Sequence, residues 1–254
     1  MRLTEVAFWD DCWKRYPIPS AVDFNSPFDR CLARALLRNL RDIHGDVFEV
    51  GCAPGKWLAF MAENFGMKAN GIEYSDAGTQ ATHRNFQALN LPVDTIIAGD
   101  FFDIKPEPRF DVVMSFGFIE HFDKPDAVVA RHAAWLKPGG KLIIGVPNFN
   151  GIYKPLQTIL DRSILDKHNL NIMNLGYFRG LVQPLRLELQ SLEYVASFEP
   201  SLPVAERGFK NLAQFLVKVF LRVSVYIRRS PVFDDINASW LSAYILAIYR
   251  KPTT

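Results

Sequence analysis

A glycine-bearing turn between two apolar segments places the strongest constraint on how this 254-residue chain folds. The turn lies in FEVGCAPGKWLAFM, residues 48–61. The apolar run Val47–Val50 is typical of a buried strand, and Gly51, Pro54 and Gly55 then mark a tight turn. A helix-like apolar pattern follows. The stretch predicts a strand, a turn and a helix, an arrangement that often holds nucleotide-like ligands.

The flanking sequence extends this pattern. From residue 46 to about 147, strand-like runs such as KANGIEY, VDTIIAGD and FDVVMSFG alternate with helix-like runs. Such alternation predicts an α/β protein with βαβ units, a parallel sheet and helices on both faces. Residues 186–198 and 239–250 are predicted to form two further strands. Hydrophobic residues make up 49% of the chain, which is enough to build one core.

The turn departs from two phosphate-binding motifs. A P-loop requires GxxxxGK[ST], but one residue too few separates Gly51 from Gly55, and Trp57 replaces the hydroxyl residue that binds Mg²⁺. A dinucleotide fingerprint requires GxGxxG, but Ala53 and Lys56 replace its second and third glycines. Neither a nucleoside triphosphate nor a dinucleotide is therefore expected.

Three carboxylates lie at or near the ends of predicted strands. Glu49 stands just before Gly51, where it repels a pyrophosphate but suits a ligand with an ammonium group. Glu73 ends KANGIEY, where a Rossmann-type fold places an acid that accepts ribose hydroxyls. Asp100 in AGDFFD suits an adenine amino group, with Phe101 packing near the ring. Each acid alone is equally well a loop or capping residue, but together they predict a nucleoside site.

Five motifs resemble the class I S-adenosylmethionine-dependent methyltransferases. They are EVGCAPG, GIEYS, AGDFFD, FDVVMSFGFIEHF and WLKPGGKLIIGVPN, within residues 41–150. The resemblance implies a Rossmann-like, seven-stranded, mostly parallel sheet whose last strand is antiparallel, with helices on both faces and added helical cap segments. Residues 186–198 and 239–250 become strands six and seven. Ala53 departs from the family's usual middle glycine, although the substitution is small.

The resemblance also implies one domain over residues 1–254. Its expected parts are a helical cover at 1–40, a cofactor-binding core at 41–150, substrate-cap segments at 151–182 and 199–236, and two final strands at 183–198 and 237–254.

S-adenosyl-L-methionine is the cofactor that the resemblance implies. Glu73 is expected to hold the ribose, Asp100 the adenine amino group, and the turn around Gly51 the methionine portion. The full set of expected cofactor residues is Glu49, Gly51, Ala53, Gly55, Glu73, Tyr74, Asp100, Phe101 and Phe116.

The chemistry needs little from the protein, because the cofactor's sulfonium is already an activated electrophile. The protein mainly aligns the acceptor behind the methyl group and excludes water. If the acceptor must lose a proton, His121, after the fourth predicted strand, is best placed to remove it, and His168 is the second candidate. The alternatives are a structural histidine and a solvated residue near a helix end. Small-molecule members of the family often carry an EH pair here, which is Glu120–His121 in this chain.

The segments outside the core are expected to select the acceptor. Trp13 and Tyr16, together with Trp9, are expected to close an aromatic lid, although packing of an N-terminal helix explains them nearly as well. Asn148, just after the fifth predicted strand, and Tyr153 are expected to reach the substrate. Asn148 also suits a turn, and Tyr153 a packing role.

A basic amphipathic helix is predicted over residues 208–230. Polar residues recur every four positions from Lys210 to Arg222, leaving a broad apolar face that includes Phe215. The favoured interpretation is that this face covers the domain and lines a greasy substrate pocket. The alternative is a weak contact with a membrane surface. Lys218 and Arg222 interrupt every run long enough to span a bilayer, so no transmembrane segment is predicted.

Charge and cysteine content narrow the functional classes. The net charge of +2 does not favour a nucleic-acid partner, and the Asn-Pro-Pro-aromatic signature of nucleic-acid methyltransferases does not follow the fourth strand. Cys12, Cys31 and Cys52 form no CxxC pair, and no metal site is predicted from them. Reduced cysteines and the lack of an apolar signal segment predict a cytoplasmic protein.

These features predict an S-adenosylmethionine-dependent methyltransferase that acts on oxygen or nitrogen of a small, partly apolar molecule. One alternative is a non-catalytic cofactor-binding or interaction module, and another is a membrane-surface enzyme with a lipid-like acceptor. A nucleotide-dependent dehydrogenase ranks lower because the GxGxxG motif fails. The acceptor, the atom methylated and the oligomeric state are left open.

Overall fold

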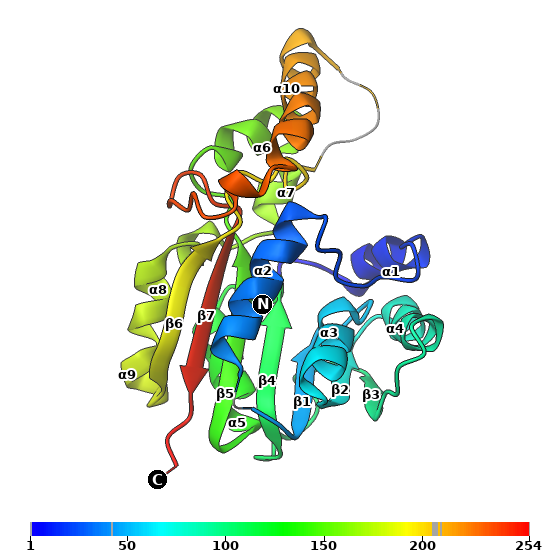
Figure 1. The fold of residues 1–254 in the computed structure, drawn as a ribbon, viewed down its shortest axis with the longest axis vertical. Coiled ribbons are helices and arrows are strands. Elements are labelled where there is room, and N and C mark those ends of the chain that lie inside the picture. The colour runs from blue at the N-terminus through cyan, green and yellow to red at the C-terminus, as the bar shows by residue number, and fades with distance from the viewer. Residues whose placement is uncertain (1, 42, 205–207, 209, 254) are drawn as a thin grey trace.

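A seven-stranded sheet runs through the centre of the protein (Figure 1). The computed structural model describes residues 2–41, 43–204, 208 and 210–253. In the strand order β3-β2-β1-β4-β5-β7-β6, β7 pairs antiparallel with β5 and β6, and the other pairings are parallel. This topology confirms the predicted sheet. The strands are β1 Asp46–Val50, β2 Lys68–Glu73, β3 Thr95–Ala98, β4 Phe110–Phe116, β5 Leu136–Pro147, β6 Glu188–Val195 and β7 Tyr244–Arg250.

The strand β7 begins later than its predicted start at residue 239. The residues before it form a turn instead, in which the N–H of Ser242 donates to the carbonyl of Ala238 at 2.8 Å. From Tyr244 onward the strand is buried except for Arg250. A strand covered on both faces needs an unbroken apolar sequence, and YILAIYR has one.

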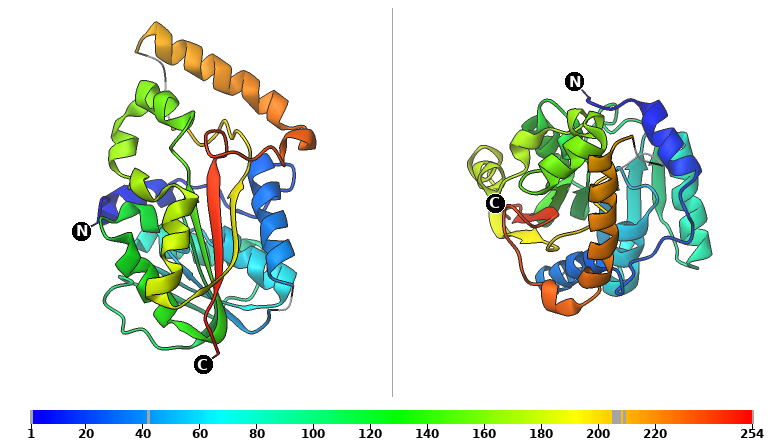
Figure 2. Two further views of the ribbon diagram at one scale, coloured as in Figure 1. Left: turned by 90° about the vertical axis from the view of Figure 1, so that its left-hand side faces the viewer. Right: turned by 90° about the horizontal axis from the view of Figure 1, so that it is seen from above.

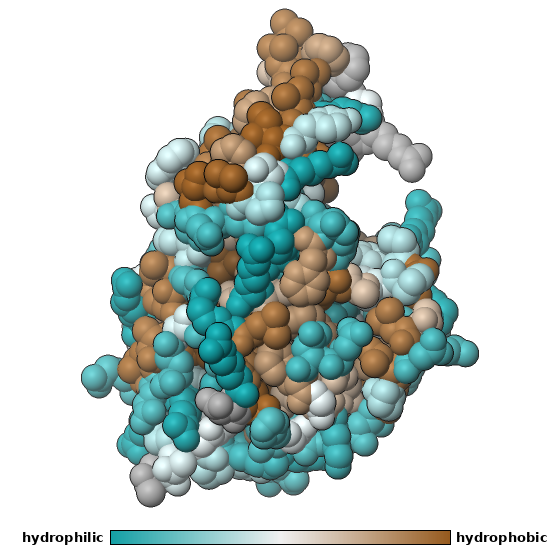
Figure 3. All heavy atoms as spheres, viewed as in Figure 1, coloured by the Kyte–Doolittle hydropathy of each residue, from teal (hydrophilic) through white to brown (hydrophobic). Residues whose placement is uncertain are grey.

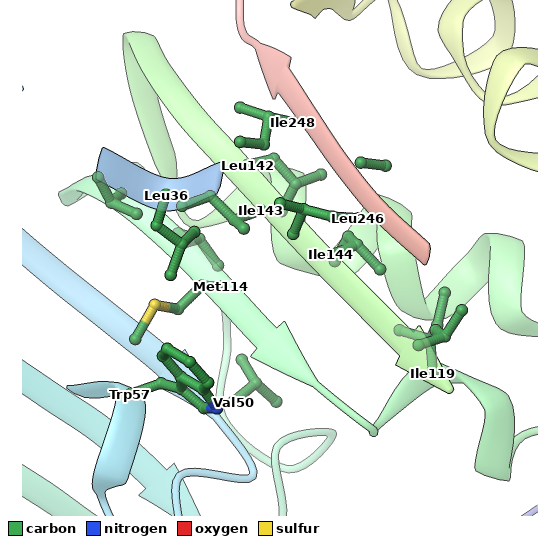
Figure 4. Close-up of a cluster of buried hydrophobic side chains, with 14 of the residues drawn as sticks. Leu36, Val50, Trp57, Met114, Ile119, Leu142, Ile143, Ile144, Leu246 and Ile248 are labelled. Carbon is green, nitrogen blue, oxygen red and sulfur yellow. The ribbon is translucent and has the colours of Figure 1, made fainter. Parts of the chain in front are cut away.

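The core lies around the middle strands. Leu142, Ile143 and Ile144 of β5 lie close to Leu246 and Ile248 of β7, and all five side chains are fully buried (Figure 4). Each such side chain stabilises the fold by about 1.5–3 kcal/mol when it leaves water. The core therefore fixes the sheet that positions the site.

Helices cover both faces of the sheet, as predicted (Figure 2). The helices α2 and α3 lie on one face, and α5, α8 and α9 lie on the other. The helix α4 packs against β2 and β3. The bounds are α2 Pro27–Asn39, α3 Lys56–Phe65, α4 Asp76–Ala88, α5 Pro125–Ala134, α8 Leu175–Gly180 and α9 Val182–Leu185.

The remaining elements gather at the carboxyl ends of the parallel strands. Among them α1 packs against α4, and α6 packs against α7 (Figure 1). The order of the sheet reverses between β1 and β4, and ligands of open α/β sheets bind at such a switch point. These elements are α1 Val6–Lys14, α6 Tyr153–Asp161, α7 Ser163–Asp166, and the short 3₁₀ turns η1 Ile119–His121, η2 Leu170–Ile172 and η3 Pro231–Phe233.

The predicted amphipathic helix is α10, Leu212–Arg228, and it extends beyond the end of the sheet (Figures 1 and 2). It packs against α6, and Gln214 Nε2 donates to the carbonyl of Ile159 at 3.1 Å. No helix in the described part of the chain is long and apolar enough to cross a bilayer. Residues 205–207 and 209 of the predicted cap segment lie outside the described residues.

The apolar face of α10 points away from the protein. Its buried residues, Leu221, Ser224 and Arg228, lie on one side. A guanidinium–carboxylate contact of 3.5 Å joins Arg228 to Asp234, which also accepts from Arg30 at 2.7 Å. Hydrophobic atoms cover much of the visible surface of the helix in Figure 3. The exposed apolar residues of α10 are Leu212, Phe215, Leu216, Val219, Phe220, Val223, Val225, Tyr226 and Ile227.

Candidate active site

A pocket opens at the carboxyl ends of β1, β2 and β4. It is lined by residues that end or follow these strands and by residues between positions 2 and 13 of the N-terminal segment. Its volume is about 770 Å³ including the open mouth. The pocket lies at the edge of the sheet where open α/β folds bind their ligands.

The glycine turn forms one wall of the pocket. The N–H of Gly51 donates to the carbonyl of Ile72 at 2.9 Å, which joins the turn to β2. Gly51 has φ of 70°, and a Cβ there would lie 2.8 Å from the ring of Phe118. Both the backbone angle and the close approach therefore favour glycine. Gly51 and Ala53 line the pocket, as expected for residues that approach a cofactor.

Glu73 lines the pocket and is tied to the same turn. Its Oε1 accepts from the N–H groups of Tyr74 and Ser75, both at 2.9 Å, and its Oε2 accepts from the N–H of Ala53 at 3.3 Å. Burial raises the pKa of Glu73, and the three amide hydrogen bonds oppose that rise. A carboxylate has about four acceptor positions, so about one remains for a ribose hydroxyl. The expectation that Glu73 accepts both ribose hydroxyls stays a prediction.

Two expected cofactor residues support the turn from outside the pocket lining. Glu49 is 4% exposed, and its Oε2 has no hydrogen-bond partner within the described residues. Burial raises the pKa of Glu49 well above its usual value, despite a backbone hydrogen bond from Leu58. Gly55, with φ of 87°, precedes the first residue of α3. Neither residue lines the pocket, and a direct contact of either with the cofactor stays a prediction.

Asp100 is paired with Arg2, a residue that the sequence motifs did not identify. The guanidinium of Arg2 forms a salt bridge with Asp100 and lies 4.5 Å from the ring centroid of Tyr74. Burial disfavours the charged form of Asp100, but hydrogen bonds from Arg2 and from the N–H of Phe102 outweigh it and lower its pKa. Arg2 and Phe101 line the pocket, whereas Asp100 does not. Its contact with an adenine amino group stays a prediction.

Aromatic side chains make up much of the rest of the wall. The expected residues Tyr74, Phe101 and Phe116 line it, and Phe118 and Phe122 join them. Phe118 and Phe122 were not predicted as site residues. They lie in the stretch FGFIEHF, and its repeated phenylalanines are the sequence feature that could have identified them. Rings of this kind pack against a base and exclude water.

The helix α1 brings two tryptophans to the pocket. Trp9 and Trp13 both line it, and their rings are stacked with centroids 6.2 Å apart. Tyr16 lies outside the lining and packs on Trp13, with 5.3 Å between ring centroids. Tyr16 is thus corrected to a residue that supports Trp13.

His121 lies in the same pocket, beside Trp9. Its Nδ1 is 2.8 Å from the carbonyl oxygen of Lys167, and a carbonyl only accepts, so Nδ1 carries the proton. The Nε2 atom of the neutral ring therefore keeps a free lone pair. Burial and, after it, the nearby His168 lower the pKa of His121 to about 3, so the ring is uncharged near neutral pH.

His168, the second candidate, lies next to His121. The two ring centroids are 4.6 Å apart. The Nδ1 atom of His168 is 2.7 Å from the carbonyl oxygen of Ile164, so this ring too carries its proton on Nδ1. The fold thus brings His121 and His168 together, although they are 47 positions apart in the sequence.

Three expected substrate residues lie outside the pocket lining. Asn148 is fully buried and donates to two carbonyls before β7, at 2.9 and 3.0 Å. Tyr153 is also fully buried, and its hydroxyl accepts from the N–H of Glu199 at 2.6 Å. Phe215 is 41% exposed on α10. These expectations are corrected, because the first two residues satisfy buried backbone groups and the third faces away from the protein.

Comparison with known proteins decides the family. A model of the methyltransferase domain family matches residues 25–192, which is more than half of the chain. The chain belongs to this family. It is a class I S-adenosylmethionine-dependent methyltransferase, and S-adenosylmethionine is its cofactor.

Individual relatives of this methyltransferase are distant. The 27-O-demethylrifamycin SV methyltransferase of Amycolatopsis mediterranei (strain S699) is 24% identical over 217 residues, covering 81% of this chain and 77% of that protein. Phosphoethanolamine N-methyltransferase 3 of Arabidopsis thaliana is 34% identical over 98 residues. The match spans 39% of this chain but only 20% of that relative's length.

A solved structure agrees with the fold. Phosphoethanolamine N-methyltransferase 2 of Haemonchus contortus, in complex with S-adenosyl-L-methionine, superimposes with a TM-score of 0.57 at 18% identity. The superposition covers 87% of this methyltransferase and 52% of the other chain. At that identity the likeness supports the fold alone.

Proposed function

We propose that this methyltransferase moves the methyl group of S-adenosylmethionine to an oxygen or nitrogen of a small, partly apolar molecule. The proposal rests on a single pocket that is lined by the glycine turn, by Glu73 and by His121. The cofactor-holding groups and a polar atom suited to an acceptor thus share one cavity. Two relatives, a 27-O-demethylrifamycin SV methyltransferase and a phosphoethanolamine N-methyltransferase, support both acceptor atoms.

The residues of the pocket have different roles in the proposed reaction. Glu73 accepts from a ribose hydroxyl, and the backbone at Gly51 approaches the methionine portion. Aromatic side chains, including Trp9, exclude water and pack against apolar parts of the ligands. His121 lines the pocket, and its ring helps to align the acceptor's hydroxyl or amine with the methyl group. His121 is the residue that we place in contact with the acceptor.

Cofactor choice and turnover test the proposal. We expect S-adenosylhomocysteine to bind in calorimetry and NAD to show no binding, because the turn lacks the glycines that approach a pyrophosphate. A panel of small hydroxyl and amine acceptors, scored by S-adenosylhomocysteine release, should then yield substrates. Binding of NAD without binding of S-adenosylhomocysteine would overturn the cofactor assignment. Cofactor binding without release from any acceptor would favour the non-catalytic module.

An anionic membrane surface is a further candidate partner, because α10 turns its apolar face outward. Leu216 is 56% exposed and Val223 is 54% exposed, and both lie opposite the buried Leu221. No acidic residue occurs between positions 208 and 230, whereas Arg222 and Arg229 are among its basic residues. A helix with an apolar stripe flanked by cations suits the interface of anionic lipids. This placement replaces the favoured expectation that Phe215 lines the substrate pocket.

Vesicle binding measures this contact. Changing Leu216 and Val223 together to Ser should lower co-sedimentation with phosphatidylglycerol vesicles by about tenfold or more, because each aliphatic side chain gains about 1.5–3 kcal/mol on full burial. The pocket and its cofactor affinity should be unchanged. The control is Val6→Ser, which removes an exposed apolar side chain from α1. If wild-type protein does not sediment with these vesicles, the membrane contact is refuted.

The acceptor class excludes nucleic acid in this proposal, since the net charge is only +2. We place the reaction in the cytoplasm because Cys12, Cys31 and Cys52 are all unpaired.

A further inference from the structure

Glu120, His121 and His168 form a compact cluster beside the cofactor pocket. One potential ligand atom from each residue lies within 4.8 Å of the other two. The Oε1 atom of Glu120 is 3.8 Å from Nε2 of His121. The backbone holds the cluster together, because the N–H of Asn169 donates to the carbonyl of Glu120 at 2.7 Å. This bond connects the loop after β4 to the segment after α7.

Both imidazoles are oriented by carbonyls outside the cluster. Each ring uses its Nδ1–H on a backbone oxygen, that of Lys167 for His121 and that of Ile164 for His168. Each ring therefore has an unprotonated Nε2. Histidines that bind metal ions nearly always donate their other N–H in this way, which fixes the tautomer and the ring direction.

The carboxylate of Glu120 lacks a compensating partner. Glu120 is 1% exposed, and its Oε2 has no hydrogen-bond partner among the residues that the structure describes. The ammonium of Lys167 lies 4.2 Å from the ring centroid of Phe8. Burying a carboxylate without a counter-charge is expensive. In agreement with that cost, burial raises the pKa of Glu120 to about 8.

We propose that Glu120, His121 and His168 bind a divalent first-row transition-metal ion at the edge of the cofactor pocket. Two imidazoles and one carboxylate form a ligand set found in catalytic zinc and non-haem iron sites. Nitrogen ligands favour such ions over Mg²⁺ or Ca²⁺, which prefer oxygen. Bond lengths of about 2.0–2.2 Å place the ligand atoms of a tetrahedral ion about 3.4 Å apart. The three ligand atoms, which now lie within 4.8 Å of one another, must therefore move together by about 1 Å when the ion binds.

The open positions of such an ion would face the acceptor. His121 lines the pocket, as does Gly117, and a Cβ at Gly117 would lie 3.5 Å from Oε1 of Glu120. An ion here lowers the pKa of an acceptor hydroxyl, whose proton leaves to solvent. The oxygen then bonds to the methyl carbon, and the electron pair of the carbon–sulfur bond returns to sulfur. This role rests on the proposed function, whereas metal binding itself does not.

Direct metal titration tests the site. Full-length protein stripped with a chelator is titrated with Co²⁺, followed by its visible absorption, and with Zn²⁺ in competition. We expect one ion per chain. Glu120→Gln and His168→Ala should each weaken binding about tenfold or more, while His83→Ala, an exposed histidine on α4, should have no effect. S-adenosylhomocysteine affinity reports the fold of each variant, since neither Glu120 nor His168 lines the pocket.

The possible outcomes are distinct. If wild-type protein binds S-adenosylhomocysteine but no Co²⁺ or Zn²⁺, the metal site is refuted. Equal metal affinity in wild type, Glu120→Gln and His168→Ala would refute it as well. Full turnover by metal-free protein would overturn the role on the acceptor. Failure of every acceptor with metal-loaded protein would instead count against the proposed function, and the binding results would stand.

Discussion

Replacing His121 with Ala is expected to slow methyl transfer by about 10²-fold at saturating cofactor, which is the typical cost of misplacing a reacting group by about 1 Å. The reason is the position of Nε2, which is a polar atom of a neutral ring in the wall of the pocket. Its lone pair is lost in the variant, whether it contacts the acceptor directly or holds an ion that does so. Single-turnover measurement of S-adenosylhomocysteine formation gives the rate without the contribution of product release.

Two controls separate this effect from a loss of structure. Calorimetry with S-adenosylhomocysteine should give a dissociation constant close to that of the wild type, because Glu73 and the glycine turn are unchanged. His83→Ala removes an exposed histidine from α4 and should leave the rate unaltered. If the folded His121→Ala protein transfers the methyl group at the wild-type rate, the proposed role of His121 is refuted.

Replacing Glu73 with Ala is expected to weaken cofactor binding by about 1.5–3 kcal/mol, or roughly 10- to 150-fold in the dissociation constant. A ribose hydroxyl loses its charged acceptor. The N–H groups of Tyr74, Ser75 and Ala53 lose theirs too, so the glycine turn is held less firmly. Calorimetry with S-adenosylhomocysteine measures the change.

The matched control is Glu63→Ala, which removes an exposed acid from the neighbouring helix α3. It should bind the cofactor like the wild type. Thermal unfolding shows whether Glu73→Ala is folded at the temperature of the experiment. An unchanged dissociation constant in that folded variant would rule out Glu73 as a ribose acceptor.

Local motifs predicted six residues that the fold brings together in one pocket. Gly51, Ala53, Glu73, Tyr74, Phe101 and Phe116 line the pocket as expected. These residues lie in or next to strand ends, and the carboxyl ends of neighbouring parallel strands meet at one edge of the sheet. A short pattern in the sequence is therefore enough to bring them together. Glu49 and Gly55 share that neighbourhood but do not line the pocket.

The residues expected to contact the acceptor were predicted less well, because they come from segments that obey no sheet register. Asn148 and Tyr153 have polar groups that satisfy buried backbone, a need that the sequence does not show. Arg2 was not identified, since a single cation near the N-terminus belongs to no periodic pattern. Phe215 lies on the apolar face that the four-residue period indicated. That period does not say toward which neighbour the face turns.

By itself, the sequence determined the α/β class, the seven-stranded sheet, the cofactor and the position of the glycine turn. Apolar periodicity and turn residues act over short distances along the chain, so they can be recognised from the sequence alone. Only the tertiary structure decided that α10 faces outward, that Arg2 pairs with Asp100, and that His168 meets Glu120 and His121. Those outcomes depend on how distant segments pack and on which buried polar groups find partners, and no local pattern encodes either.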